Sequence, residues 1–130
     1  MPTIDLFTTV LPLAHKKSIA VALTRWLADR ETSPRNVIVT FHQLEPHSTF
    51  SGGIALDALV AGDHRPHYAL ALCRIGPDRD DHFRAELARQ LTTQLHTHGP
   101  VPFVYIEFRT TAPAQVYIAR DGALTRADTP

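Results

Sequence analysis

The sequence predicts an α+β domain in which two β-α-β repeats form a four-stranded mixed sheet, with two helices on one face of it. Two observations carry this prediction. Strand-like and helix-like stretches follow one another in the order β-α-β twice along the 130 residues. The two halves also share apolar positions at a nearly constant offset. The matched positions are Leu23 with Leu87, Leu27 with Leu91, Val37 with Val104, and Phe41 with Phe108.

The first half reads strand, helix, strand. A strand is expected within residues 1–7, where apolar and polar side chains alternate. Apolar side chains recur at helical spacing over about residues 15–29, and the β-branched stretch 36–41 predicts the second strand. A loop over residues 45–53 ends in paired glycines, and residues 54–60 are expected to form a short helix.

The second half repeats this order. Residues 68–73 form a nearly continuous apolar stretch, typical of a strand covered on both faces. Asp80 is a candidate N-cap for a helix whose apolar face includes Leu87. Residues 101–108 predict the fourth strand, and residues 115–118 a fifth strand at an edge. Two helices on one face leave the other sheet face open, so we expect self-association through that face.

Length and composition indicate one domain over residues 1–122, with repeat halves at about 2–60 and 66–118 and a polar, mobile tail at 123–130. The 13 basic and 13 acidic residues form no basic stripe, which argues against a nucleic-acid partner. No apolar run reaches the roughly 18 residues of a membrane span, and the single cysteine, Cys73, excludes an internal disulfide. We therefore expect a cytoplasmic protein without a membrane partner.

Pro2 carries the main candidate chemistry. Proline is tolerated at the first position of a strand, and this structural role alone would explain its place. If Met1 is removed, however, Pro2 has a free secondary amine whose direction is fixed by the start of the strand. An α-amino group titrates near about 7.7–8.0, so burial or a nearby cation keeps it neutral and basic at physiological pH.

A proline after Met1, two β-α-β units and a Gly-Gly turn together resemble the tautomerase superfamily. Residues 36–53 resemble 4-oxalocrotonate tautomerase, and residues 104–107 resemble macrophage migration inhibitory factor. Residues 72–79 and 113–115 resemble cis-3-chloroacrylic acid dehalogenase. The resemblance implies a homotrimer, a catalytic amino-terminal proline and no cofactor.

The same resemblance implies roles for two arginines. Pro2 matches the catalytic proline, and Arg74 matches one of the two carboxylate-binding arginines of the dehalogenase. Arg79 matches the second arginine once a two-residue insertion is allowed. We therefore expect Pro2 and Arg74 to be catalytic, with Arg79 in a supporting substrate-binding role.

Three further residues are candidates for substrate binding. Tyr105 and Phe50 are expected in the pocket wall. Glu107 either lies near Pro2 or carries a charge at a subunit interface. The helix histidine and the water-activating glutamate of the dehalogenase correspond here to Asp29 and Ala119, which argues against hydrolytic dehalogenation.

The expected function is a cofactor-independent tautomerase in which Pro2 acts as the base on a small 2-oxo or enol carboxylate. One alternative is a dehalogenase-, hydratase- or decarboxylase-like enzyme that acts on an unsaturated or 3-oxo carboxylate. Another is a non-catalytic interaction trimer. In each case we expect trimer contacts through the open sheet face and the strand near Val116 and Ile118.

The histidine pairs indicate no metal site. These pairs, which lie in expected loops without a cysteine partner, are His64 with His67 and His96 with His98. Cys73 ends an apolar strand and is interpreted as a small core residue.

Overall fold

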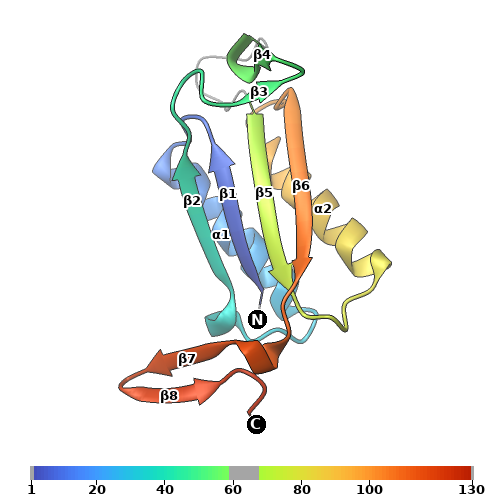
Figure 1. Ribbon diagram of the computed structural model, residues 1–130. Coiled ribbons are helices and arrows are strands. Elements are labelled where there is room, and N and C mark those ends of the chain that lie inside the picture. The colour runs from blue at the N-terminus through green and yellow to red at the C-terminus, as the bar shows by residue number, and fades with distance from the viewer. Residues whose placement is uncertain (1, 59–67, 130) are drawn as a thin grey trace.

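The computed structural model describes residues 2–58 and 68–129, and its main body is a four-stranded sheet with two helices on one face (Figure 1). The strand order is β2-β1-β5-β6. The elements of this body are β1 (Thr3–Thr8), α1 (Leu13–Ala28), β2 (Ile38–Gln43), β5 (Tyr68–Ile75), α2 (Asp81–Leu95) and β6 (Phe103–Thr110). This confirms the predicted fold class. Neither helix in the described part of the chain is long and apolar enough to cross a membrane.

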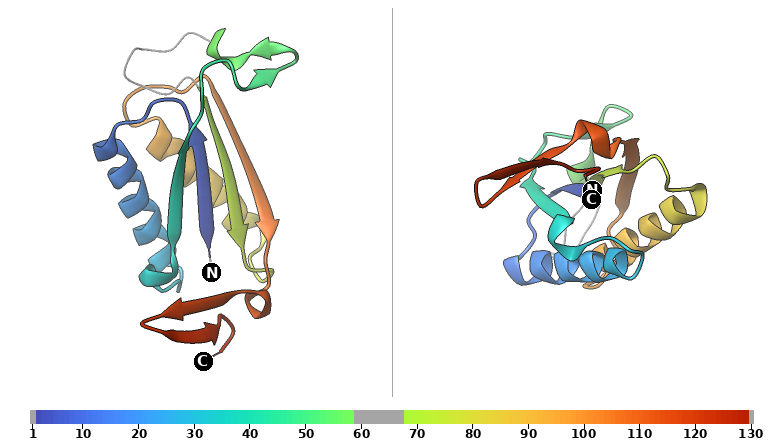
Figure 2. Two further views of the ribbon diagram at one scale, coloured as in Figure 1. Left: turned by 60° about the vertical axis from the view of Figure 1, so that its left-hand side comes forward. Right: turned by 90° about the horizontal axis from the view of Figure 1, so that it is seen from below.

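Strand pairing follows the repeat. β1 is parallel to β2, β5 is parallel to β6, and the two halves meet where β1 and β5 pair antiparallel. Along β1, Ile4 and Leu6 are buried, whereas the side chains of Thr3, Asp5 and Phe7 alternate with them and are only partly buried. The sheet therefore has one face against the helices and one face that no helix covers (Figure 2).

Leucines at matched positions of the two helices form the centre of the core. Leu23 and Leu27 of α1 and Leu87 and Leu91 of α2 are fully buried. Burial of each such side chain stabilises the fold by about 1.5–3 kcal/mol. The Asp80 side chain caps α2 by accepting a backbone N–H of the first turn at 2.9 Å, as the sequence predicts.

The segment after β2 differs from the sequence-based expectation. A helix was expected over residues 54–60, but Ile54–Ala55 form strand β4, which pairs antiparallel with β3 (Phe50–Ser51). Only one 3₁₀ turn, η2 (Leu56–Ala58), is helical, and residues 59–60 lie outside the described residues. The two glycines between β3 and β4 have φ values of 59° and 81°, which favour a tight hairpin over a helix.

The C-terminal segment also differs. β7 (Tyr117–Arg120) falls close to the strand expected at 115–118, but it pairs with β8 (Ala123–Arg126) in a separate two-stranded sheet. Residues 123–126 were expected in the polar tail, and this expectation is corrected by β8. The Asp121-Gly122 turn has positive φ at both residues, as a two-residue hairpin turn requires. The hairpin lies at the end of the molecule where β1 begins (Figures 1 and 2).

Candidate active site

Pro2 lines a cavity of about 260 Å³ at the end of the sheet where β1 begins. Four parts of the chain meet there. They are the segment between α1 and β2, the loop after β5, the first turn of α2, and the residues on either side of the β7–β8 hairpin. The other residues that line the cavity are Glu31, Thr32, Ser33, Asn36, Ile75, Gly76, Asp78, Arg79, Phe83, Pro113 and Ala127. Pro2 and Arg79 are thus the two expected site residues that the fold brings together.

Pro2 is buried and is held by the sheet. Its carbonyl oxygen accepts the backbone N–H of Ile38 at 3.3 Å, which extends the β1–β2 ladder to the residue before β1. It occupies the same side of the strand as Ile4 and Leu6, toward the helices. Met1 lies outside the described residues.

Three contacts fix the side chain of Arg79, and a fourth holds its backbone. Its Nη2 donates to the carbonyl oxygen of Arg30 at 3.3 Å and to Oγ1 of Thr32 at 3.2 Å. The guanidinium carbon lies 4.5 Å from the centre of the Phe83 ring, at cation–π distance. Its backbone N–H donates to the carbonyl of Gly76 at 3.3 Å. Because a planar guanidinium has five N–H donors, these bonds leave others available for a carboxylate.

Aromatic packing supports this arginine from behind. The ring of Phe83 lies 5.4 Å from that of Trp26, centre to centre, and the two planes meet at 53°. The guanidinium of Arg30 in turn lies 3.7 Å from the centre of the Trp26 ring. The stack joins α1 and α2 beside the cavity, so it limits the positions that Arg79 can take.

The cavity also contains acidic groups that the sequence analysis did not single out. Glu31 and Asp78 line it together with Arg79. The Asp78 side chain lies against Gly76, because its Oδ1 is 2.7 Å from where a β-carbon on Gly76 would sit. The Gly76-Pro77-Asp78 sequence, a turn signal after a strand, is the feature that could have indicated Asp78.

Arg74 lies elsewhere. It pairs with Thr3 in the β1–β5 ladder, and its Nη1 donates to Oδ2 of Asp5 at 2.6 Å on the sheet face without helices. The Nε2 of His42 donates to Oδ1 of the same carboxylate at 2.9 Å, and the His42 ring stacks on Phe7 at 4.4 Å. Hydrogen bonds from His42, and next from Arg74, hold the pKa of Asp5 below its usual range. Arg74 is not among the described residues that line the Pro2 cavity.

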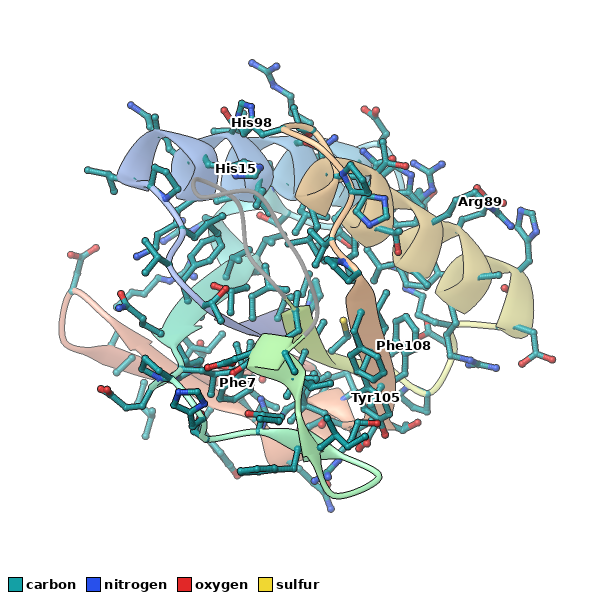
Figure 3. The ribbon with its side chains drawn as sticks, turned by 90° about the horizontal axis from the view of Figure 1, so that it is seen from above. Phe7, His15, Arg89, His98, Tyr105 and Phe108 are labelled. Carbon is teal, nitrogen blue, oxygen red and sulfur yellow. The ribbon has the colours of Figure 1, made fainter. Side chains whose placement is uncertain are left out.

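Tyr105 and Glu107 form a separate cluster on β6. The Tyr105 hydroxyl donates to Oε1 of Glu107 at 2.9 Å, and Nε of Arg109 donates to Oε2 at 2.8 Å. Arg109, and next Tyr105, lower the pKa of Glu107, whereas the bond to Glu107 raises the pKa of Tyr105. Figure 3 shows Phe7 and Tyr105 on the side of the sheet away from the helices. The structure does not bring Tyr105 or Glu107 to the cavity within this chain.

Phe50 is also distant from Pro2. It belongs to the β3–β4 hairpin, at the opposite end of the sheet from the start of β1, and is 59% exposed (Figure 1). Its side chain is therefore open to contact with another molecule. Within this chain it forms no part of the Pro2 cavity wall.

The remaining candidates lie in the core or near the helix ends. His98 contacts the buried His15 edge to face at 4.3 Å (Figure 3), while His64 and His67 lie outside the described residues. Across residues 2–58 and 68–129, no three His, Cys, Asp or Glu side chains are placed to hold a metal ion. Burial, with a smaller effect of Asp5, raises the pKa of the Cys73 thiol to about 12.

Comparison with solved structures relates this arrangement to known proteins. A member of the cis-3-chloroacrylic acid dehalogenase family matches with a TM-score of 0.73 and 15% identity, over 97% of this chain and 85% of that one. A fused 4-OT, described as a wild-type symmetric trimer, matches with a TM-score of 0.71 and 14% identity, over 96% of this chain and 97% of that one. The chain has the tautomerase-superfamily fold. Macrophage migration inhibitory factor of Toxoplasma gondii matches with a TM-score of 0.68 and 16% identity, over 95% of this chain and 99% of that one.

No protein-family model and no curated protein matches the chain. What the chain shares with these solved structures is the arrangement of its two β-α-β units. In this fold the Pro2 cavity lies where the first strand begins, between the end of α1 and the start of α2.

Proposed function

We propose that the chain is a cofactor-independent tautomerase-type enzyme in which the amine of Pro2, freed by loss of Met1, is the general base for a small 2-oxo or enol carboxylate. The observation that carries this proposal is that Pro2 and Arg79 line one cavity. A base and a cation at one site are the two groups that enol–keto exchange of such a substrate requires.

The proposed reaction moves one proton. The neutral amine accepts the enol O–H proton, the enolate electrons form the carbonyl, and the protonated amine returns a proton to the adjacent carbon. Substrate and product therefore have the same composition, and the base is regenerated. Proton transfer by a positioned group contributes about 10²–10⁴-fold to the rate.

Arg79, rather than Arg74, is the arginine that we assign to the substrate carboxylate. Its guanidinium is fixed at the cavity by Thr32, Arg30 and Phe83, so little rotamer entropy remains to be lost on binding. Arg74 is already bonded to Asp5 on the other sheet face. Its expected catalytic role would require the substrate or a second subunit to break that bond.

We further propose a homotrimer that buries the open sheet face. A fused 4-OT of the same fold is described as a trimer, and this face carries partly buried apolar and charged side chains with no helix over them. Phe50 and Tyr105 lie outside the cavity of their own chain, so they could line a pocket only as residues contributed by another subunit. The expected role of Glu107 then becomes that of an interface charge.

The test compares two forms of the same protein. Expression with and without inhibition of methionyl aminopeptidase yields chains that retain or lack Met1, identified by intact mass. In the Met1-retaining form the proline nitrogen is an amide without a basic lone pair, so enol ketonisation should fall at least about 100-fold. Equal rates for the two forms would rule out Pro2 as the base and leave it a strand-start residue.

Hydration of an unsaturated carboxylate is a second candidate, favoured by the two acidic residues in the cavity. Neither Asp29 nor Ala119 is among the described residues that line it, but Glu31 and Asp78 are. In this reaction the Asp78 carboxylate takes a proton from water, the hydroxide adds to the β-carbon of the substrate, and the protonated Pro2 amine delivers a proton to the α-carbon. The Asp78 carboxyl then gives up its proton to solvent and the amine takes one from solvent, which restores both groups. If Asp78→Asn loses hydration but keeps ketonisation, the hydratase function is supported. If Asp78→Asn and the wild type hydrate the substrate at the same rate, Asp78 is excluded as the base for hydration.

A further inference from the structure

The turn that ends α1 carries a hydroxyl group to the Pro2 cavity. Thr32 lines this cavity together with Pro2 and Arg79. The end of α1 lies at the same end of the molecule as the start of β1 (Figure 2). The cavity therefore contains a neutral hydroxyl in addition to the candidate base and the candidate carboxylate-binding group.

The backbone of this turn is fixed by two hydrogen bonds. The N–H of Thr32 donates to the carbonyl of Leu27 at 3.2 Å. The N–H of Glu31 donates to the carbonyl of Ala28 at 3.3 Å. These are the two bonds of a Schellman motif, in which the residue after the helix is left-handed and is usually glycine. Glu31 takes this conformation, with φ of 69°. Thr32 is thus held in one position at the cost of a backbone strain that glycine would avoid.

The Thr32 hydroxyl accepts one hydrogen bond and keeps its own proton. Nη2 of Arg79 donates to Oγ1 of Thr32 at 3.2 Å and to the carbonyl of Arg30 at 3.3 Å. A hydroxyl has two acceptor lone pairs and one donor, which rotates to suit its partner. None of the described residues accepts the proton of the Thr32 hydroxyl. Since hydrogen bonds in a chain polarise one another, the bond from the guanidinium makes this proton a stronger donor.

The position of this hydroxyl fits a substrate whose oxygen lies next to its carboxylate. Nη2 of Arg79 is already bonded, so the carboxylate is left to Nη1 and Nε, which have no acceptor among the described residues. In a 2-oxo acid or its enol, the reacting oxygen is on C2, the carbon attached to the carboxylate. With the carboxylate on Arg79, this oxygen would lie within reach of Thr32, the side chain bonded to the same guanidinium.

We propose that Thr32 is a catalytic residue that donates a hydrogen bond to the C2 oxygen of the substrate, and that it thereby favours carboxylates with an oxygen on C2. The proposal rests on the proposed function for the identity of the reaction. As the Pro2 amine takes the enol proton, negative charge develops on the C2 oxygen, and the Thr32 hydroxyl stabilises this charge. The amine then returns the proton to the adjacent carbon. Only this proton moves, and Thr32 keeps its own.

The variants for the test differ in one hydroxyl. Thr32→Val removes the hydroxyl and keeps the branched shape, whereas Thr32→Ser keeps the hydroxyl. Thr24→Val is the matched control. Thr24 lies on α1, its hydroxyl donates to the carbonyl of Ala20 at 2.7 Å, and it is not among the residues that line the Pro2 cavity. Both valine variants thus lose a threonine hydroxyl, but only one of them loses it from the cavity.

The first measurement is ketonisation of the enol of phenylpyruvate by processed protein. Thr32→Val should lose roughly 10- to 100-fold in kcat/KM, chiefly in kcat, because the hydrogen bond strengthens as charge develops on the oxygen. Thr32→Ser should stay within about threefold of the wild type, and Thr24→Val within about twofold. A change of less than about twofold in Thr32→Val, or an equal loss in Thr32→Ser, would overturn the role of the hydroxyl.

A binding measurement separates this role from support of Arg79 alone. Benzoylformate has a C2 oxygen but no hydrogen that would allow it to enolise, and phenylacetate is the matching carboxylate without that oxygen. In titration calorimetry, Thr32→Val should raise the Kd of benzoylformate at least about fivefold and that of phenylacetate less than about twofold. If both Kd values rise equally, Thr32 acts only by holding Arg79, and the contact to the C2 oxygen is rejected.

The same titration distinguishes failure of the proposed function from failure of this contact. If processed protein does not ketonise the enol, the tautomerase function is rejected. A selective loss of benzoylformate binding in Thr32→Val, absent in Thr24→Val, would still support the contact to the C2 oxygen. An unchanged Kd of benzoylformate in Thr32→Val would reject the contact whether or not the protein is active.

Discussion

Arg74 and Asp5 form an ion pair between adjacent antiparallel strands, Nη1 to Oδ2 at 2.6 Å, on the face of the sheet that the helices leave open. The same carboxylate accepts a hydrogen bond from His42. Asp5 thus links β5, β1 and β2 by side chains as well as by the backbone ladder. The arginine that the sequence resemblance favours for catalysis is part of this link, whereas Arg79 lines the Pro2 cavity.

The first prediction concerns these two arginines. Arg79→Ala should lower kcat/KM for enol ketonisation by roughly 10–150-fold, because a charge-assisted contact to a carboxylate is worth about 1.5–3 kcal/mol. Arg74→Ala should lower it less and reduce stability more, since the change leaves Asp5 without one of its two partners. Steady-state kinetics and urea unfolding measured on both variants test this order. A larger kinetic effect of Arg74→Ala would restore the order expected from the sequence.

The second prediction concerns how the free energy of unfolding depends on pH. The pKa of Asp5 is lowered in the folded protein, first by His42 and then by Arg74. A lowered folded-state pKa stabilises the fold above the unfolded value of about 3.9, and the stability is lost as pH falls toward the folded value. His42→Ala should therefore cost stability at pH 6, and the difference from wild type should shrink below about pH 4.

The measurement is urea unfolding between pH 2.5 and 6.5 at one fixed protein concentration. His42→Gln, which retains an N–H donor, is the control and should keep much of the effect at pH 6. A constant difference between wild type and His42→Ala across this range would show that the Asp5 contact does not contribute through ionisation.

The third prediction concerns Cys73. Its side chain is fully buried, and its pKa is raised to about 12, chiefly by burial. Since the thiolate is the reactive form, only about one thiol in 10⁴ would be ionised at pH 8. Iodoacetamide at pH 8 should leave the native protein unmodified and label it fully in guanidinium chloride. Rapid labelling of the native protein would contradict the burial of β5 between the sheet neighbours and the helices.

The sequence predicts the two β-α-β units well because their signal is local. Apolar spacing identifies α1 and α2, and the matched Leu23 and Leu87 identify the repeat. β8 is missed because its residues are polar and exposed, so that only the Asp121-Gly122 turn indicates it. Residues 123–130 were expected to be a tail because they are polar, whereas β8 forms because the preceding turn has the geometry of a hairpin.

The sequence predicts the site only in part, because the positions of its residues depend on contacts between distant segments. Pro2 shares a strand face with Ile4, and Cys73, opposite Ile4 in the ladder, shares the buried face. Its neighbour Arg74 must then point to the other face, as strict alternation along a strand requires. This argument needs the register of β1 against β5, which the sequence does not supply. The cavity itself depends on connections from four parts of the chain, and only the fold shows that they meet.

The last prediction follows from the charges around Pro2. In the proposed mechanism the rate rises with pH as the Pro2 amine loses its proton. In the processed protein we expect burial and the Arg79 guanidinium to lower the pKa of this amine, and the carboxylates of Glu31 and Asp78, which line the same cavity, to raise it. Asp78→Asn removes one of the opposing charges and keeps the shape of the turn against Gly76. The rising limb of kcat/KM should therefore move to lower pH, by up to about one unit, and Arg79→Gln should move it to higher pH.

Profiles of kcat/KM from pH 4.5 to 9 on processed protein measure these shifts. Glu45→Gln, an exposed change in the connection after β2, removes one negative charge without altering the cavity and should leave the midpoint within about 0.2 units. Opposite shifts for Asp78→Asn and Arg79→Gln, with neither seen in Glu45→Gln, indicate that both groups act on the amine at close range. If Asp78→Asn moves the midpoint upward, or no further than the control does, the titrating base is not the amine in this cavity, because removal of a nearby negative charge cannot stabilise the protonated form.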